Sequence, residues 1–317
     1  MPAIPIYFNL DGGGNPGLEA GGIRLAAMLE NEVAWMLADM ASIRRTGALR
    51  FLGDVSGSGS DAVTMRFSSL GAKTPFASAD EYDDVAPTGL TTSTSTCTVS
   101  RSTLRWDISD LASMTGFGAD LDPFSIAASM AQSAEARINE LICSTFGSAS
   151  ATAGTSTAAL SLDSFFDAQF ALELASNTGE YYCILHPKSL SQLVDSLRGE
   201  SNNALAYAPA TADMLAIKGQ GYAGTLLGVN IFKSAYVQKN GGLTDYLGAM
   251  MSSGGVAYAI GTPGPMVGAT ELRPAGSPVV VEFQRDSSNA LTEIIGHLYA
   301  GCAISEQDRI VQLISAV

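Results

Sequence analysis

The sequence predicts an α+β protein in which a β-rich segment, one long helix and a compact α/β unit follow one another. Residues 48–110 are rich in Gly, Ser and Thr and carry short alternating apolar runs, which are typical of strands. Residues 123–146 keep apolar side chains on one helical face for roughly five turns. Beyond residue 162, helical and strand patterns alternate, which indicates an α/β unit.

Composition indicates a folded protein of low charge. Of the 317 residues, 46% are apolar and only 15% are charged, a balance typical of globular chains. A low charge fraction suits a protein whose surface is largely covered by other subunits, and secreted all-β proteins share it. The formal net charge of -14 disfavours binding to phosphate backbones, which argues against reading of nucleic-acid sequence.

The cysteines and the N-terminus indicate a cytosolic protein. Cys97, Cys143, Cys183 and Cys302 form no C-x-x-C pair, so we expect reduced thiols rather than a disulfide framework. No basic residue precedes Arg24, and no Pro-free apolar stretch is long enough to span a bilayer. We therefore expect neither a signal peptide nor a membrane anchor.

The first 110 residues predict an arm, a helix and a hairpin. Residues 1–22 contain three prolines and many glycines, which favours an extended arm. Residues 22–45 have apolar positions at helical spacing and should form an amphipathic helix that stops at Gly47. Residues 48–110 should form a long two-stranded hairpin, whose tip carries the acidic run 80–84 and a Ser/Thr tract.

The rest of the chain predicts a long helix and two groups of strands. Asp122 and Pro123 are a strong helix start, and Gly147 marks the end of that helix. Residues 148–159 should be a linker. The expected helices and strands that follow are 162–176, 181–185, 189–197, 226–233 and 255–260. Residues 279–285, 292–304 and 309–314 should close the chain as a small antiparallel sheet.

This order of segments resembles the major capsid proteins of tailed bacteriophages, the Hong Kong 97 class. The run Tyr181–Pro187 followed by a helix is similar to the strand, proline and helix of the family's axial domain, and residues 227–234 are similar to its later strand. The resemblance covers nearly the whole chain and implies five regions. These are an N-terminal arm and helix (1–46), an extended hairpin loop (47–110), a peripheral domain with a spine helix (111–162), an axial α/β domain (163–265) and returning peripheral strands (266–317).

The resemblance implies a structural role without catalysis. Such a subunit assembles with itself as pentamers and hexamers into an icosahedral shell that encloses phage DNA without reading its sequence. Separate scaffolding and portal proteins, and in some cases a decoration protein, are the implied partners; no membrane is implied. The implied location is the virion capsid, after synthesis in the bacterial host cytoplasm. No scaffold-like segment rich in charge and heptads precedes the arm, so a scaffold should be a separate protein.

Three other functions stay open at this point. An encapsulin nanocompartment has the same fold and houses a protein cargo instead of DNA. An α/β enzyme would be built on residues 181–197 and would be a monomer that binds a nucleotide. A phage tail or decoration protein would form tubes or stay small.

No residue pattern supplies catalysis, a cofactor or a metal. Gly219–Gly224 matches G-x-G-x-x-G, but a strand-like run follows it where a dinucleotide site needs a helix, so we expect a turn. Only His186 and His297 could serve as a base, and no G-x-S-x-G elbow is present. The acidic run 80–84 lacks the alternating ligand spacing of a calcium loop.

Contacts between subunits are expected on the hairpin. Its cations could pair with acidic patches of a neighbour, and its tryptophan could anchor the contact or pack into the protein's own core. These candidates are Arg66, Lys73, Arg101, Arg105 and Trp106. Some family members join such a lysine to an asparagine of a neighbouring subunit, although most do not. At Lys73 this crosslink would need a buried glutamate and a dry pocket.

Overall fold

The computed structural model describes most of the chain between residues 29 and 317. The described ranges are 29–37, 43–44, 46–55, 60–69, 91–111, 123–175, 179–199, 207–218, 221–262, 279–286 and 288–317. The predicted arm, Lys73 and the acidic run 80–84 lie outside these residues. Among the helices in these ranges, none is long and apolar enough to cross a membrane.

The chain divides into two compact units. The first contains residues 1–39, 101–134 and 262–299, and the second contains residues 40–100, 135–261 and 300–317. The long helix α3 (Pro123–Ser144) and the long strand β13 (Leu291–Ile304) each contribute residues to both units.

A seven-stranded mixed sheet is the centre of the second unit. The strand order is β5-β14-β10-β6-β9-β8-β7, so neighbours in the sheet come from distant parts of the sequence. Two pairs, β6 with β9 and β5 with β14, are parallel and the others are antiparallel. The strands are β5 (Ala151–Ala153), β6 (Tyr181–Leu185), β7 (Tyr207–Pro209), β8 (Tyr222–Leu226), β9 (Val229–Lys233), β10 (Asp245–Ser252) and β14 (Ile310–Ala316).

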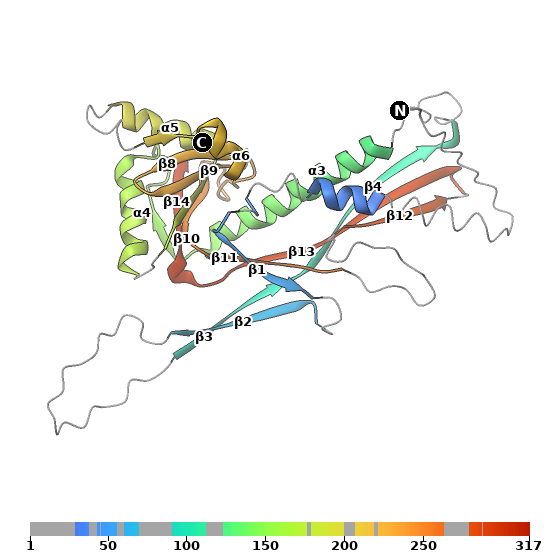
Figure 1. The fold of residues 1–317 in the computed structure, drawn as a ribbon, viewed down its shortest axis with the longest axis horizontal. Helices are drawn as coiled ribbons and strands as arrows, with labels where there is room; N and C mark the ends of the chain where they lie inside the picture. Colours follow the sequence, from blue (N-terminus) through green and yellow to red (C-terminus); the bar gives the residue numbers. More distant parts are fainter. Residues whose placement is uncertain are drawn as a thin grey trace, which may run out of the picture. The chain divides into compact units, whose positions relative to one another are not determined.

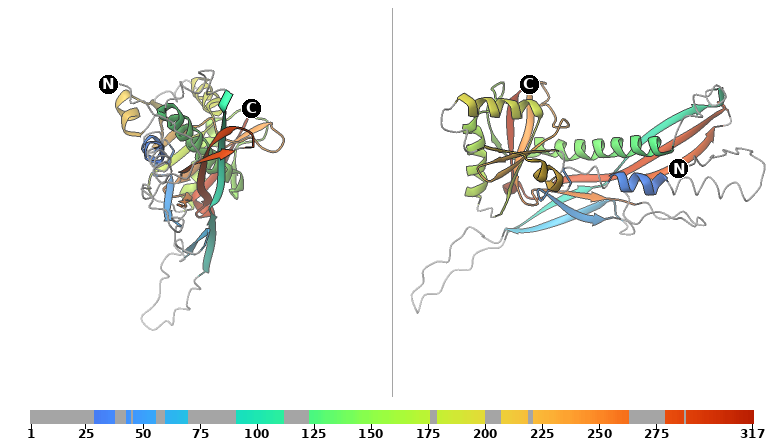
Figure 2. Two further views of the ribbon diagram at one scale, coloured as in Figure 1. Left: turned by 90° about the vertical axis from the view of Figure 1, so that its right-hand side faces the viewer. Right: turned by 45° about the horizontal axis from the view of Figure 1, so that its top comes forward.

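Two helices cover one face of this sheet. These are α4 (Leu162–Leu174) and α5 (Pro187–Gly199), and Figures 1 and 2 show both beside the strands. Their apolar sides form a core with Cys183, Val229 and Met250 of the sheet. Alternation along β9 therefore assigns Val229 and Ile231 to the covered face, and Asn230 and Phe232 to the other face.

Four sequence predictions are wrong for this sheet. Residues 151–153 of the predicted linker form its strand β5, and the predicted strand 255–260 belongs to another sheet. Strand β14 pairs with β10 and β5 rather than closing the C-terminal antiparallel sheet, because its apolar residues complete the core under α4. The predicted strand 226–233 is two segments, β8 and β9, joined at Leu227 and Gly228. Both residues have positive φ, 52° and 82°, which is the backbone of a tight hairpin turn.

A five-stranded sheet contains β1 (Leu49–Asp54), β11 (Val256–Ile260), β13 and β12 (Val279–Asp286) in that order, with β4 (Ser100–Ser109) paired to β13. Strand β1 runs parallel to β11. The prediction that residues 48–110 form one two-stranded hairpin is therefore too simple. Its two ends, β1 and β4, belong to this sheet, and only β2 (Ala62–Ser69) and β3 (Thr91–Thr98) pair as an antiparallel ribbon.

The base of the β2–β3 ribbon is anchored in the second unit. Met65 and Cys97 are 7% and 0% exposed and pack against Ala257 and Ala259 of β11. The Ser95 hydroxyl donates a hydrogen bond to the Ile304 carbonyl at 2.6 Å. Among the described residues, these contacts attach the base of the ribbon to β11 and β13.

In the first unit, β4, β13 and β12 lie side by side (Figure 1). Residues 29–37 form a helix whose buried side chains Leu29, Val33 and Leu37 match the predicted apolar spacing. Glu30 is also buried, and its Oε1 accepts a hydrogen bond from the Val281 amide of β12 at 2.8 Å. This bond satisfies a backbone donor of the sheet.

In the second unit, α3 carries a buried ion pair. Arg44 donates from Nε and Nη2 to Oε2 of Glu135 at 3.1 and 2.6 Å. Asn139, one turn later, donates to Oε1 of the same carboxylate at 3.1 Å. A buried charge is stable only with its partners. The Glu135 carboxylate therefore fixes the position of Arg44, which precedes β1, against helix α3.

Candidate subunit-contact surfaces

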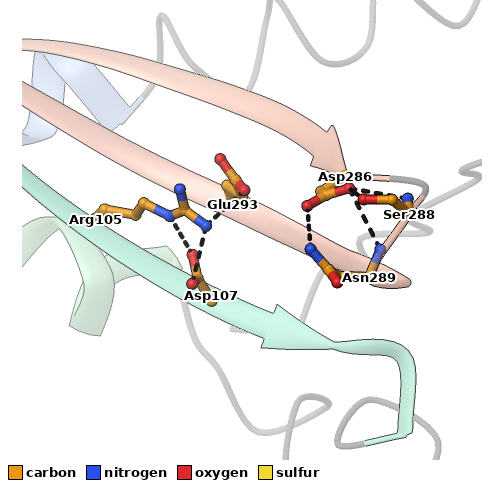
Figure 3. Close-up of polar contacts among 6 residues, drawn as sticks. All are labelled: Arg105, Asp107, Asp286, Ser288, Asn289 and Glu293. Atoms are coloured by element: carbon orange, nitrogen blue, oxygen red, sulfur yellow. Dashed lines mark hydrogen bonds and ion pairs between the residues drawn. The ribbon is translucent and has the colours of Figure 1, made fainter.

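Arg105 on β4 is held by two carboxylates of its own chain. Its Nε contacts Asp107 Oδ1 at 2.6 Å and its Nη2 contacts Glu293 Oε1 of β13 at 2.7 Å, as Figure 3 shows. Hydrogen bonding to Asp107 raises the pKa of the guanidinium. Arg105 and Asp107 are about half exposed, whereas Glu293 is buried. The group carries one positive and two negative charges, so the guanidinium of Arg105 is fully compensated within its own chain.

The β12–β13 turn beside it is also fixed by a carboxylate. Asp286 accepts hydrogen bonds from the amide and hydroxyl of Ser288 and from the side chain of Asn289 (Figure 3). These bonds lower the pKa of Asp286 to about 2. Arg285 forms a bidentate pair with Asp110 at the end of β4, with two contacts of 2.5 Å. The turn is a rigid, polar end of the sheet.

The other predicted contact residues are dispersed. Arg66 lies exposed on β2, and neither it nor Arg101 on β4 makes an ion pair with any residue that the structure describes. Arg101 is exposed and Trp106 is half-buried, and both lie on β4. Lys73 lies outside the described residues. The structure therefore groups Arg105 with acidic partners and leaves Arg66 and Arg101 as separate exposed cations.

Sequence reasoning missed an apolar groove on α4. Its lining residues are Phe166, Gln169, Phe170, Glu173 and Leu227, and its volume is about 460 Å³. The first four lie on the outer side of α4, and Leu227 lies in the β8–β9 turn. A signal was present, since α4 reads LDSFFDAQFALEL and is apolar on more than its core-facing side.

The residues that the sequence analysis considered for a dinucleotide, a base or a metal have the following surroundings in the described part of the chain. There, no three metal-ligating side chains come together. Gly224, the last glycine of the G-x-G-x-x-G match, lies inside strand β8, and the helix α6 (Ala212–Lys218) precedes the match instead of following it. His186 is the N-terminal cap of α5, since its Nδ1 accepts the Lys188 amide at 3.1 Å. His297 is a half-buried residue of β13, as expected.

Comparison with known proteins gives a clear result for structure and none for sequence. No protein-family model matches the chain. No curated protein matches it either.

Several solved shell proteins are similar in structure. The mature capsid of bacteriophage PhiM1 matches with a TM-score of 0.57 at 11% identity, over 86% of this chain and 86% of that chain. A Mycobacterium phage Che8 structure matches with a TM-score of 0.52 at 15% identity, over 81% of this chain and 85% of that one. The SrpI encapsulin of Synechococcus elongatus matches with a TM-score of 0.58 at 14% identity, over 84% and 85%.

These matches extend over more than four fifths of both chains in each comparison, so they include both units and not a shared supersecondary motif alone. The identities are too low to carry over any residue's role. What they establish is the fold predicted from the order of segments: this chain has the Hong Kong 97 fold of the tailed-phage major capsid proteins.

Proposed function

We propose that this chain is the major head protein of a tailed phage, a subunit that assembles with copies of itself into a closed icosahedral shell around DNA. The observation that carries the proposal is the match to whole capsid subunits over more than 80% of this chain and of each neighbour. The function is mechanical.

The charge of the chain suits packaged DNA as contents. With a formal net charge of -14, the shell wall repels phosphate groups on the whole, so DNA can move past it during packaging. A closed shell confines DNA by enclosing it, so the subunit needs no contacts to the DNA bases. The proposed location is the virion capsid, after synthesis in the bacterial cytoplasm, with separate scaffolding, portal and, where present, decoration proteins as partners.

The five regions predicted from the sequence remain our proposal for how the subunit is organised. The arm (1–46) and hairpin loop (47–110) would reach neighbouring subunits, and the axial domain (163–265) would surround the pentamer and hexamer axes. The two-stranded β2–β3 ribbon supports this role for the loop, because a two-stranded ribbon is marginally stable in water and gains from a partner.

Negative-stain electron microscopy of the purified protein tests the proposal. We expect closed particles of uniform diameter that contain nuclease-protected DNA when purified from a phage-producing culture. A protein that stays monomeric at all concentrations and in every salt condition would exclude a shell role.

The alternative function is an encapsulin shell, because the structure of an encapsulin is as similar to this chain as the phage capsid structures are. The same particles distinguish the two functions. Particles that contain a stoichiometric protein cargo and no nucleic acid would identify a nanocompartment, whereas tails and a DNA-filled interior identify a phage head.

A further inference from the structure

The seven-stranded sheet of the second unit has an exposed apolar surface on α4. Phe166, Phe170 and Leu174 recur every four residues along the helix and are 42%, 64% and 70% exposed, and Leu227 beside them is 40% exposed. We call these four residues the α4 surface. Phe166, Phe170 and Leu227 line the groove of about 460 Å³ together with Gln169 and Glu173. Single exposed apolar residues are ordinary, but a contiguous group marks a binding surface.

A second exposed apolar surface lies on α6. Met214, Leu215 and Ile217 are 40%, 36% and 81% exposed, and we call them the α6 surface. The helix is held to the sheet through Lys218, whose Nζ donates to Asn230 Oδ1 at 2.5 Å and lies 4.9 Å from the ring centre of Tyr222. The apolar side chains of the helix thus remain uncovered by the described part of this chain.

The two surfaces belong to opposite faces of the same sheet. The α4 side of the sheet contains Val229 and Ile231 in its core, whereas the α6 anchor residue Lys218 binds Asn230, which points the other way on β9. Figures 1 and 2 agree, since both draw the strands between α4 and α6. One copy of the chain therefore cannot bring its own two surfaces together, but two copies can.

Charge disfavours a contact between two α4 surfaces. The exposed charged residues of α4 are Asp163, Asp167 and Glu173, all acidic, so two α4 surfaces facing each other would place like charges together. Helix α6 carries one acid, Asp213, and one base, Lys218. Pairing α4 with α6 avoids that repulsion and buries both apolar groups.

We propose that the α4 surface of one subunit packs against the α6 surface of the next, so that copies join head to tail into rings. A contact between two different surfaces repeats from copy to copy and generates a ring when the rotation closes. The inference rests on the proposed shell function, which requires such rings as pentamers and hexamers. It deepens that function by naming the two surfaces.

Thiol crosslinking tests the contact in the assembled protein. In the variant Phe170→Cys plus Ile217→Cys, each subunit carries one thiol on each surface, and a short bismaleimide joins thiols that face each other. We expect a denaturing gel to show a ladder of linked chains that ends at five and six copies. The background should be low, because burial raises the pKa of the native Cys143 and Cys302 thiols to about 12 and Cys97 and Cys183 are buried.

Three controls define the result. The parent chain and Phe170→Cys alone should stay monomeric on the gel, because a head-to-tail contact never brings two α4 surfaces together. Leu243→Cys plus Ile217→Cys should also give no ladder, since Leu243 is 69% exposed but lies outside both surfaces. Linked dimers from Phe170→Cys alone would show an α4-to-α4 contact and overturn the proposal.

Electron microscopy of the same samples separates this inference from the proposed function. Closed particles without a crosslinked ladder would overturn the α4-to-α6 contact and leave the shell function standing. Crosslinked pentamers and hexamers on the gel without closed particles in the microscope would support the α4-to-α6 contact and contradict the shell function.

A charge exchange gives a second, independent readout. Phe170→Asp adds a fourth acid to the exposed side of α4, and we expect at least a ~10-fold drop in particle yield, the effect of losing about 1.4 kcal/mol per contact. Ile217→Lys in the same chain should restore much of the yield by facing the new acid across the contact. Equal yields for the parent and Phe170→Asp would overturn the proposal.

Discussion

Gly301 on β13 lies where the connection between β3 and β4 passes close over the sheet. A Cβ atom at this position would be 2.2 Å from the Thr98 carbonyl oxygen and 3.0 Å from Val99 Cα, both backbone atoms that cannot rotate away. Gly296, five residues earlier on the same strand, has only the Met130 side chain and the Leu104 carbonyl within 3.6 to 3.9 Å. Position 301 therefore requires a glycine, because the two backbones lie too close for a side chain, whereas position 296 has room for a methyl group.

We expect Gly301→Ala to lower the free energy of unfolding by ~1–3 kcal/mol, because the methyl group overpacks a rigid crossing. Urea unfolding followed by circular dichroism measures it. Gly296→Ala is the matched control on the same strand and should change stability by less than ~0.5 kcal/mol. Equal effects of the two substitutions would contradict the backbone-crossing explanation.

Asp245 at the start of β10 is a fully buried carboxylate that holds two loops. Its oxygens accept hydrogen bonds from the Ser156 hydroxyl at 2.6 Å, the Thr157 amide at 2.5 Å and the Asn240 side chain at 2.6 Å. Thr157 has a φ of 63°, which is strained for a β-branched residue and needs such support. The hydrogen bond from Ser156 is the main reason that the pKa of Asp245 is lowered, followed by the bond from Thr157.

This lowered pKa predicts acid sensitivity. As pH falls, the unfolded chain binds a proton at Asp245 near pH ~3.9, before the folded chain does, so the stability from this carboxylate is present above that pH and is lost below it. We expect the unfolding midpoint to fall between pH 5 and pH 3, and to fall less steeply in Asp245→Asn. Identical pH profiles for the two proteins would exclude Asp245 as a source of the sensitivity. Asp110 and Asp286, with pKa values that are also lowered, should supply the remaining slope.

At the scale of elements, helix α3 carries one buried and one exposed ion pair, which contribute differently to the free energy of unfolding. The Arg44–Glu135 pair has side chains only 14% and 9% exposed, whereas Arg137 and Glu140, three residues apart on the same helix, are 43% and 47% exposed. Removing one partner of a buried pair leaves a charge without compensation, while an exposed pair exchanges its bond for water.

We expect Glu135→Ala to destabilise the protein by ~3–5 kcal/mol and Glu140→Ala by less than ~1 kcal/mol. The double substitution Arg44→Met plus Glu135→Leu should recover much of the loss, because neither charge then remains buried. Thermal unfolding of the three variants measures the difference. A loss in the double variant as large as in Glu135→Ala would show that the pair does more than balance charge.

The β2–β3 ribbon is a sheet of two strands in the described part of the chain. Its base packs against β11 through Met65 and Cys97. Its outer pairs, from Arg66↔Thr94 to Ser69↔Thr91, have no third strand beside them within the described part of the chain. Strand pairs without a packed face open readily.

Hydrogen exchange should therefore report assembly at the ribbon. We expect fast exchange of the outer amides, residues 66–69 and 91–94, in unassembled protein, and at least ~10-fold slower exchange in closed particles. The amides of β10, central in its sheet, serve as the internal reference and should exchange slowly in both samples. Unchanged exchange of the outer amides on assembly would exclude a partner contact at the ribbon.

At the scale of the whole molecule, the fold brings distant segments into single sheets. Residues 151–153, 181–185, 245–252 and 310–316 become neighbours in one sheet, so this sheet is completed only when the last strand of the chain is in place. The contacts that we propose between subunits lie on the outer sides of α4 and α6 and on the ribbon. Two of these three surfaces were not apparent from the sequence.

The sequence by itself determined what depends on local pattern. Apolar spacing and the Asp122–Pro123 start predicted α3, alternating runs predicted β12 and β13, and the order of segments predicted the capsid fold that the structural comparison then confirmed. Only the tertiary structure decided what depends on which segments meet. It placed β14 beside β10, split residues 226–233 at Leu227, bound Arg105 between two acids and left one side of α4 uncovered. The reason is physical: periodicity reports which face of an element is apolar, but strand pairing and burial depend on partners that lie far away in the sequence.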